Sequence, residues 1–379
     1  MNFKKVINLD FKTFDLAIIL VLIFSNLVFL EDSVNNMLLA AVILLLGFFR
    51  FFKPGINFNK VFLLIISLSS FITVVTWQPN KISLIVLLFL YLIAKSNPKL
   101  INIDLYINLS IIIFLLITSF YFLFGLNIDY DTTIWRPLEG KSYPRMSLGY
   151  YHSNQAMLKW LILVMALFSK GLSKSNMTKI IPILVITYLL YSVTVSRTST
   201  LIVFMICSLF YIFKNKLHIT LTKKMVNILA LLPLFFTVIS LLMVRLTEIT
   251  WINNLLSGRL VIYSNALQTY GITLLGSSEI EKLMFDNAFL HMLLGKGIIF
   301  SVIYFFLFYK VVKGAEYITF REALIILGFL CVGIMETMLL KFEILILLIA
   351  MLYREKDELL VPYSTGKKKK IFKRITLSR

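Results

Sequence analysis

Apolar runs about as long as a membrane-spanning helix recur along the whole chain, and they constrain its fold more than any other feature. A helix needs roughly 20 apolar residues to cross a bilayer. Only 15% of the residues are charged, against about 25% in soluble domains. The sequence therefore predicts an all-α polytopic membrane protein. Twelve spans are expected, near residues 15–30, 34–52, 61–77, 82–94, 107–126, 153–169, 180–195, 199–213, 225–246, 288–309, 322–338 and 341–353.

The link between the last two predicted spans, Leu340–Glu343, is very short. A single re-entrant element, and hence eleven spans, is the alternative for this pair. Basic residues predict the orientation: with the N-terminus in the cytoplasm, 27 of the 38 Lys and Arg residues lie on the cytoplasmic side, as the positive-inside rule requires. Both termini are therefore expected inside, with one membrane domain over 1–353 and a basic cytoplasmic tail over 354–379.

The basic tail contains the run KKKKIFKR (367–374). Such a run next to a span suits contact with anionic membrane lipid, and nucleic-acid binding is the weaker interpretation, so no nucleic-acid partner is expected. The two cysteines, Cys207 and Cys331, fall within predicted spans and are expected to be small core residues.

Two long outer loops, expected over 127–152 and 247–287, hold most of the polar residues on the outer side. The second loop contains the stretch SGRLVIYSNALQTYG (257–271), which predicts an amphipathic helix. Ser257 is expected to cap this helix and Gly271 to end it. The apolar residues that recur at helical spacing are Leu260, Tyr263, Leu267 and Tyr270.

Polar residues stand at the predicted outer starts of three spans and of the loop helix. They are His152-Ser153-Asn154, Ser196-Arg197-Thr198, Asp286-Asn287 and Ser257-Gly258-Arg259. Helix N-termini bind anions, and a cation there is unfavourable for the helix alone. Arg197 and Arg259 occupy such positions, and Arg136 and Arg145 lie in the first outer loop. A phosphate ligand would explain these arginines; the alternative is that each one reaches lipid phosphates at the membrane surface.

Two residues are candidates for proton transfer at the outer side. His152 is a candidate general base or a hydrogen-bond donor to sugar. Asp286 is either a base that activates a sugar hydroxyl or a plain helix cap. Lys159, Lys296 and Glu336 fall inside predicted spans, where a charge is costly and is expected to pair or to line a cavity.

No metal site and no cofactor are expected. The chain has no CxxC, HExxH, GxxxxGK[ST] or GxGxxG motif. Asp129-Tyr130-Asp131 has the DxD form of many nucleotide-sugar transferases, but it is predicted on the outer face, where nucleotide-sugars are absent. Glu31-Asp32 is interpreted as part of a capped hairpin, with the metal-binding acidic pair of some lipid-phosphate-dependent transferases as the alternative.

Four segments together resemble the O-antigen polymerase (Wzy-type) family of bacterial capsule and O-polysaccharide synthesis, and also the related O-antigen ligases. They occur in the family's order over about residues 150–300, with spans on both sides. The segments are LGYYHSNQAMLKW (148–160), VSRTSTL (195–201), LLSGRLVIYSNAL (255–267) and FDNAFLHMLLGKGII (285–299).

This resemblance implies a GT-C-like, inverting and metal-independent glycosyltransferase in the bacterial cytoplasmic membrane. It would join oligosaccharide repeat units carried on undecaprenyl pyrophosphate at the outer face, beside membrane lipid and other polysaccharide-assembly membrane proteins. Arg197 and Arg259 match motif positions and would hold the pyrophosphate, and Asp286 or His152 would take the proton. The expected substrate-binding residues are Arg145, Arg136, Asn154, Asn287 and Lys296.

Two departures from the family bear on this assignment. Ligases place a His where this chain has Asp286, which favours a polymerase. The Arg-x10-Gly pattern of some polymerases is not met, because Gly271 comes one residue late after Arg259. The alternatives are a ligase-type glycan transferase, and a lipid-linked oligosaccharide flippase or transporter, which would place charge near the midplane of the spans.

Overall fold

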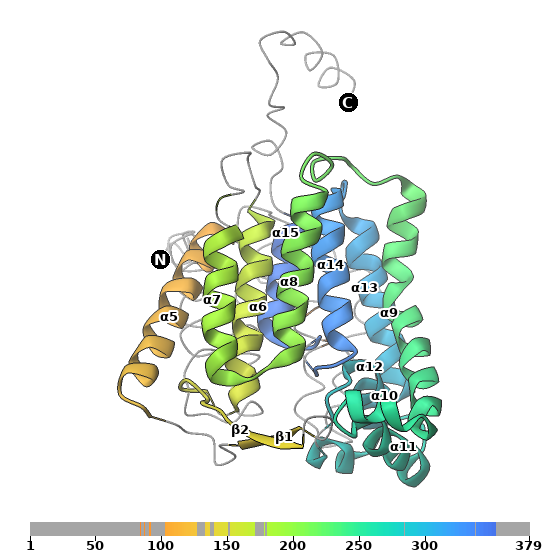
Figure 1. Ribbon diagram of the computed structural model, residues 1–379. Coiled ribbons are helices and arrows are strands. Elements are labelled where there is room, and N and C mark those ends of the chain that lie inside the picture. Colours follow the sequence, from red (N-terminus) through yellow and green to blue (C-terminus); the bar gives the residue numbers. More distant parts are fainter. Residues whose placement is uncertain are drawn as a thin grey trace, which may run out of the picture.

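The computed structural model describes residues 103–126, 133–136, 140–150, 152–170, 180–283, 285–337 and 339–353, together with the single residues 84, 87, 91 and 178. This part of the chain is mostly helical, as the sequence predicts. Figure 1 shows a bundle of long helices with short elements gathered at its lower end. Apart from those single residues, the first four predicted spans lie outside the described residues, as does the basic tail.

The long helices of the bundle run alternately down and up in Figure 1. Each follows an apolar run that the sequence marks as a span, because such a run buries side chains on one face and leaves the others apolar. The helices are α5 (Ile103–Leu123), α6 (Ser153–Ser169), α7 (Ile180–Thr194), α8 (Arg197–Ile212), α9 (Lys223–Val244), α13 (Ile298–Gly314), α14 (Phe320–Gly333) and α15 (Phe342–Tyr353).

Helix α6 forms the centre of the described core. Thirteen of its 17 residues are buried, as expected for a helix that is apolar on every face. Its Trp160 Nε1 donates to Thr187 Oγ1 of α7 at 2.8 Å, so the buried indole N–H is satisfied. Phe168 stacks on Phe210 of α8 with ring centroids 4.3 Å apart. The main core is thus built around the helix that follows His152.

The short elements lie at the lower end of the bundle (Figure 1). Two of them form an antiparallel strand pair in the first predicted outer loop, and the rest belong to or follow the second. They are β1 (Thr133–Arg136), β2 (Lys141–Pro144), the 3-10 helices η5 (Arg245–Glu248) and η6 (Ser278–Lys282), the helices α10 (Thr250–Leu255), α11 (Arg259–Tyr270) and α12 (Ala288–His291), and the π-helix η7 (Met292–Lys296).

The prediction of one continuous span over 288–309 is wrong. The segment forms α12 and η7, and it then breaks at Gly297, whose φ of 93° lies in the left-handed region. An extended segment pairs with the break: Ile298 N donates to Thr273 O at 3.0 Å, and Ser277 N donates to Leu294 O at 2.9 Å. The helical hydrogen bonds that are lost at the break are therefore replaced by hydrogen bonds to the segment that precedes η6.

The last two predicted spans are two separate helices. Helix α14 ends at Gly333, five residues before the predicted end at 338, and α15 begins at Phe342. The connecting turn, described at residues 334–337 and 339–341, lies at the lower end of the bundle (Figure 1). Glu336, which the sequence places inside a span, therefore lies in this turn.

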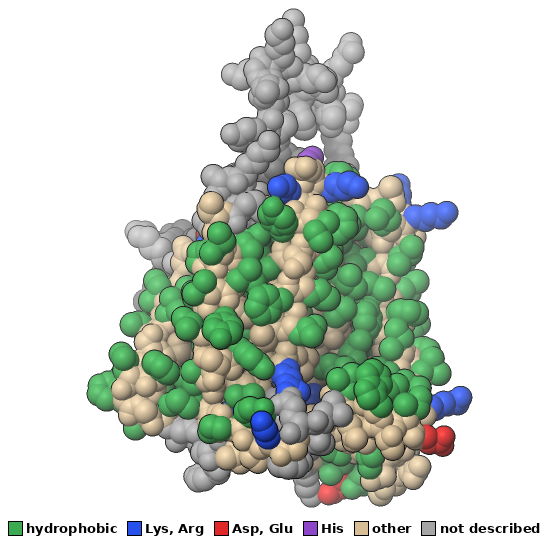
Figure 2. All heavy atoms as spheres, viewed as in Figure 1, with side chains coloured by type: hydrophobic (Ala, Val, Ile, Leu, Met, Phe, Trp, Pro, Cys, Tyr) green, Lys and Arg blue, Asp and Glu red, His purple; other side chains and the backbone are tan. Residues whose placement is uncertain are grey.

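Apolar side chains cover much of the outside of the bundle (Figure 2). By length and composition, one described helix, Lys223–Glu248 with 26 residues, is long and apolar enough to cross a membrane. Four others are apolar but shorter. Large apolar side chains that are more than half exposed on these helices include Leu116, Phe120, Ile181, Tyr188, Leu201, Ile228, Leu231 and Phe235.

Candidate functional site

The elements that carry the four sequence segments begin at the same end of the bundle. The N-termini of α6, α8, α11 and α12 all lie at its lower end (Figure 1), as predicted from the direction of the spans. Arg259 makes side-chain contacts to two other parts of the chain at this end of the bundle.

Arg259 joins three separate parts of the chain. Its Nη2 lies 2.8 Å from Asp286 Oδ2, and its Nη1 donates to the Met335 carbonyl oxygen at 3.1 Å. The Arg259 side chain is 21% exposed and that of Asp286 is 32% exposed. The guanidinium therefore holds α11, the residue before α12 and the turn 334–341 together, and the ion pair still reaches the surface.

A tight turn between α10 and α11 positions Arg259 as the first residue of its helix. Ser257 and Gly258 both have positive φ, at 57° and 79°, and Gly258 N donates to Asn253 O at 2.8 Å. Gly258 is the N-cap residue, so the prediction that Ser257 caps this helix is wrong. Gly271 ends the helix, as predicted.

An apolar cluster beneath the ion pair orients α11. Leu260 and Tyr263 of α11 are buried against Phe285, Leu290 and Leu294. Tyr263 and Phe285 have ring centroids 4.7 Å apart. The helical spacing that the sequence shows for the loop helix thus produces a buried face, and that face packs on the residues flanking Asp286.

Asn287, and not Asp286, caps α12. Its Oδ1 accepts from Leu290 N at 2.9 Å, and its Nδ2 donates to Ser240 Oγ at 3.0 Å. Asn287 is 1% exposed, so its amide serves the fold and the interpretation of Asp286 as a plain cap is wrong. Because Asn287 caps the helix, the Asp286 carboxylate is available to pair with Arg259.

Glu336 also belongs to this site, and the sequence predicted only that its charge would pair or line a cavity. It is 7% exposed, and it interacts electrostatically with Asp286, Arg259 and Lys341. Burial, and next the negative charge of Asp286, raise the pKa of the Glu336 carboxyl to about 8, while Arg259 and Lys341 oppose the shift. The available signal was an acidic residue in an otherwise apolar run.

Tyr263, which belongs to α11, also lies at this site. Its side chain is 2% exposed, and it interacts with Arg259, Asp286 and Glu336. Burial raises the pKa of the Tyr263 hydroxyl. The hydroxyl faces the backbone of Asp286 but has no partner in hydrogen-bond geometry among the described residues.

His152 is the N-cap residue of α6. Its Nδ1 accepts from Asn154 N at 3.2 Å, so Asn154 contributes its backbone amide here. A neutral imidazole that accepts at Nδ1 carries its proton on Nε2. In this arrangement neither ring nitrogen is free to take a proton without loss of the cap.

The capping role of His152 predicts how its variants behave. His152→Asn keeps a good cap, and we expect it to retain both thermal stability and activity. His152→Ala is expected to lose about 1 kcal/mol of stability, since it removes the cap. The stability of the two variants is measured by thermal unfolding in detergent, followed by size-exclusion chromatography. A folded His152→Asn protein without activity would instead assign His152 to the chemistry.

Arg145 and Arg197 both lie close to the turn that joins α7 to α8. Arg197 is the first residue of α8 and is exposed. Arg145 is 6% exposed, and its neighbour Met146 donates its amide to Val193 O, near the end of α7, at 3.0 Å. The structure thus places these two arginines around the α7–α8 turn, on elements separate from that of Arg259.

The remaining predicted substrate residues lie elsewhere. Lys296 is 2% exposed and ends the π-helix next to the break at Gly297. Arg136 ends strand β1 opposite Lys141, and its side chain lies outside the described part of the structure. Among the described residues, no group of three His, Cys, Asp or Glu side chains is arranged to hold a metal ion. Glu31-Asp32 and Asp129-Tyr130-Asp131 lie outside the described residues.

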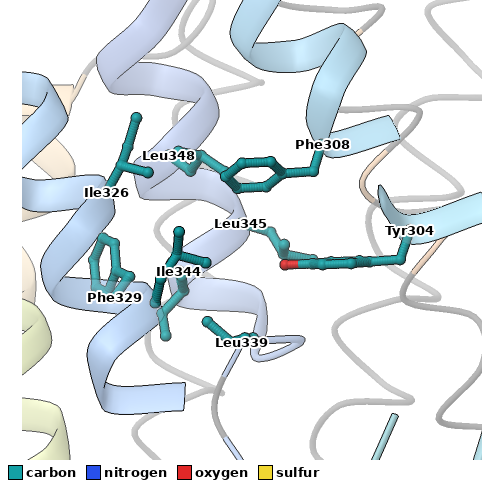
Figure 3. A pocket seen from close by; sticks show the side chains of 9 residues that line it. Tyr304, Phe308, Ile326, Phe329, Leu339, Ile344, Leu345 and Leu348 are labelled. Atoms are coloured by element: carbon teal, nitrogen blue, oxygen red, sulfur yellow. The ribbon is translucent and has the colours of Figure 1, made fainter. Parts of the chain in front are cut away.

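An apolar cavity lies beside the turn 334–341, between α13, α14 and α15. Tyr304 and Phe308 point from α13 toward Phe329, Leu339 and Leu345 (Figure 3). Leu339 belongs to the turn that carries Glu336. The lining offers no charged group, so the cavity has no chemistry of its own.

Comparison with known proteins adds no assignment. No family model, no curated protein and no solved structure matches this chain. The functional argument therefore rests on the residues of the site described above.

Proposed function

We propose that the protein is a membrane-embedded glycosyltransferase that polymerises lipid-linked oligosaccharide repeat units at the outer face of the bacterial cytoplasmic membrane. The observation that carries this proposal is the Arg259–Asp286 ion pair. It joins two of the family-like segments, SGR and FDN, at the end of the bundle where all four segments begin. Part of the pair is accessible, as a substrate site requires.

The distribution of side chains supports the membrane location. The middle of the bundle presents mostly apolar side chains, and Lys and Arg side chains line its upper edge, while its lower end shows both basic and acidic side chains (Figure 2). Exposed lysines at the upper helix ends include Lys214, Lys216, Lys223 and Lys224. Under the positive-inside rule the upper end is cytoplasmic, so the Arg259–Asp286 site would face the outside.

The proposed reaction transfers a glycan from undecaprenyl pyrophosphate to a sugar hydroxyl. The hydroxyl oxygen forms a bond with the anomeric carbon, and the bond from that carbon to the pyrophosphate oxygen breaks with its electron pair. Arg259 would stabilise the charge that develops on the leaving pyrophosphate. Its guanidinium has five N–H donors, so the contacts to Asp286 and Met335 leave donors for a phosphate. Arg197 would assist from the α8 terminus, as the family resemblance suggests.

A reconstituted assay tests this proposal. Purified protein in liposomes receives lipid-linked repeat units as the only substrate, and the products are separated by gel electrophoresis. A ladder of products, absent with heat-denatured protein, is expected. Repeat units that cross the bilayer without any new glycosidic bond would point to a transporter, and transfer only to an added acceptor would point to a ligase.

A further inference from the structure

We propose that Glu336 is the group that accepts the proton of the attacking sugar hydroxyl, and that Arg259 holds the turn that carries it. This inference rests on the proposed function. It follows from the way Arg259 binds the turn 334–341. The hydrogen bond from Nη1 to Met335 O anchors the residue next to Glu336. Glu336 also interacts electrostatically with the guanidinium that pairs with Asp286.

The two proton acceptors suggested by the sequence are both engaged. Asp286 presents one carboxylate oxygen to Arg259 at 2.8 Å, so protonation there would weaken the ion pair that joins α11 to the bundle. His152 accepts at Nδ1 from the Asn154 amide of α6. Glu336 has neither role. It starts no helix, and the hydrogen bond that Arg259 donates to its turn is accepted by the Met335 carbonyl oxygen.

The charged and titratable groups that interact with Glu336 come from three parts of the described structure. They are Arg259 and Tyr263 from α11, Asp286 from the residues before α12, and Lys341 from the end of the turn. The pKa of about 8 for Glu336 results mainly from burial and then from Asp286. A general base works best when its pKa is near the operating pH, and Glu336 meets this condition.

The proton balance of the step is simple. As the hydroxyl oxygen bonds to the anomeric carbon, its proton passes to the ionised Glu336 carboxylate. The leaving pyrophosphate carries away the electron pair of the broken carbon–oxygen bond. Glu336 then returns its proton to water. The step needs no metal, oxidant or further reactant, and it requires Glu336 to be deprotonated before each turnover.

The pH profile of polymer formation tests the role of Glu336. Because the base acts when deprotonated, wild-type activity is expected to rise with pH and to level off above about pH 8. Asp286→Asn removes a negative charge that raises this pKa, so the rise is expected to move to lower pH in whatever activity remains. Glu336→Gln is expected to lower activity at least 100-fold and to abolish the rise, and Glu336→Asp is expected to restore part of both.

Two controls make the test decisive. Glu248→Gln changes an exposed acid at the same end of the bundle and is expected to leave activity and profile unchanged. Difference infrared spectroscopy on unreacted protein is expected to show a carboxyl that titrates near pH 8 and that is missing in Glu336→Gln. If a folded Glu336→Gln protein formed polymer with the wild-type pH profile, the inference about Glu336 would be overturned and the proposed function would stand. Failure of the wild type to make any polymer would overturn the proposed function, while the infrared signal still decides whether Glu336 binds this proton.

Discussion

Arg259→Ala is expected to abolish polymer formation and to leave single lipid-linked repeat units. Loss of a group that stabilises transition-state charge costs about 100- to 1,000-fold in rate. The same change leaves the Asp286 carboxylate without its guanidinium partner and releases the turn 334–341 from Nη1. Arg259→Lys keeps the charge but loses the fork of donors, so it is expected to recover only part of the activity. Product length on gels and initial rates in the reconstituted assay measure these effects.

A matched control for Arg259 is available at the same end of the bundle. Arg245 begins η5 and is exposed, so Arg245→Ala also removes one positive charge from this end. It is expected to leave product length and rate near wild-type values. Polymer of normal length in Arg259→Ala, or equal losses in the two variants, would remove Arg259 from the proposed chemistry.

Gly297→Ala is expected to cause a large loss of stability next to the site. Gly297 has a φ of 93°, and a Cβ there would lie 2.5 Å from Gly276 N and Leu274 O. These are backbone atoms of the extended segment that pairs with the broken helix, so no side-chain movement relieves the clash. Strain of this kind costs on the order of 1–3 kcal/mol, and overpacking adds roughly 1–3 kcal/mol. We expect little folded protein to be recovered.

Gly258→Ala separates the conformational effect from the steric one. Gly258 also has a positive φ, at 79°, but a Cβ there would meet nothing within 4 Å. Only the left-handed backbone is then unfavourable, by about 1–2 kcal/mol. Thermal unfolding of both variants in the same detergent compares the two. Equal unfolding midpoints for the two variants would show that residues 273–277 shift to make room for a methyl group at Gly297.

Much of the helical architecture follows from local signals. The α7–α8 turn, the start of α6 at Ser153 and the end of α11 at Gly271 were predicted because apolar runs and their polar or glycine boundaries are adjacent in the chain. The break at Gly297 was missed for the opposite reason. Its run is apolar on both sides, and the break depends on pairing with residues 273–277.

Local sequence was sufficient to place Arg259 at the start of a helix, Asp286 before another, and both at one end of an apolar bundle. It left their partners open, because a charged side chain pairs with whichever group the fold brings near. Arg259 and Met335 are 76 positions apart, and no pattern in either segment refers to the other. The packing of α11 on residues 285–294 and the early end of α14 decide that Asp286, Arg259 and Glu336 meet. The same packing buries Glu336 in the turn after α14, and this burial raises the pKa of its carboxyl.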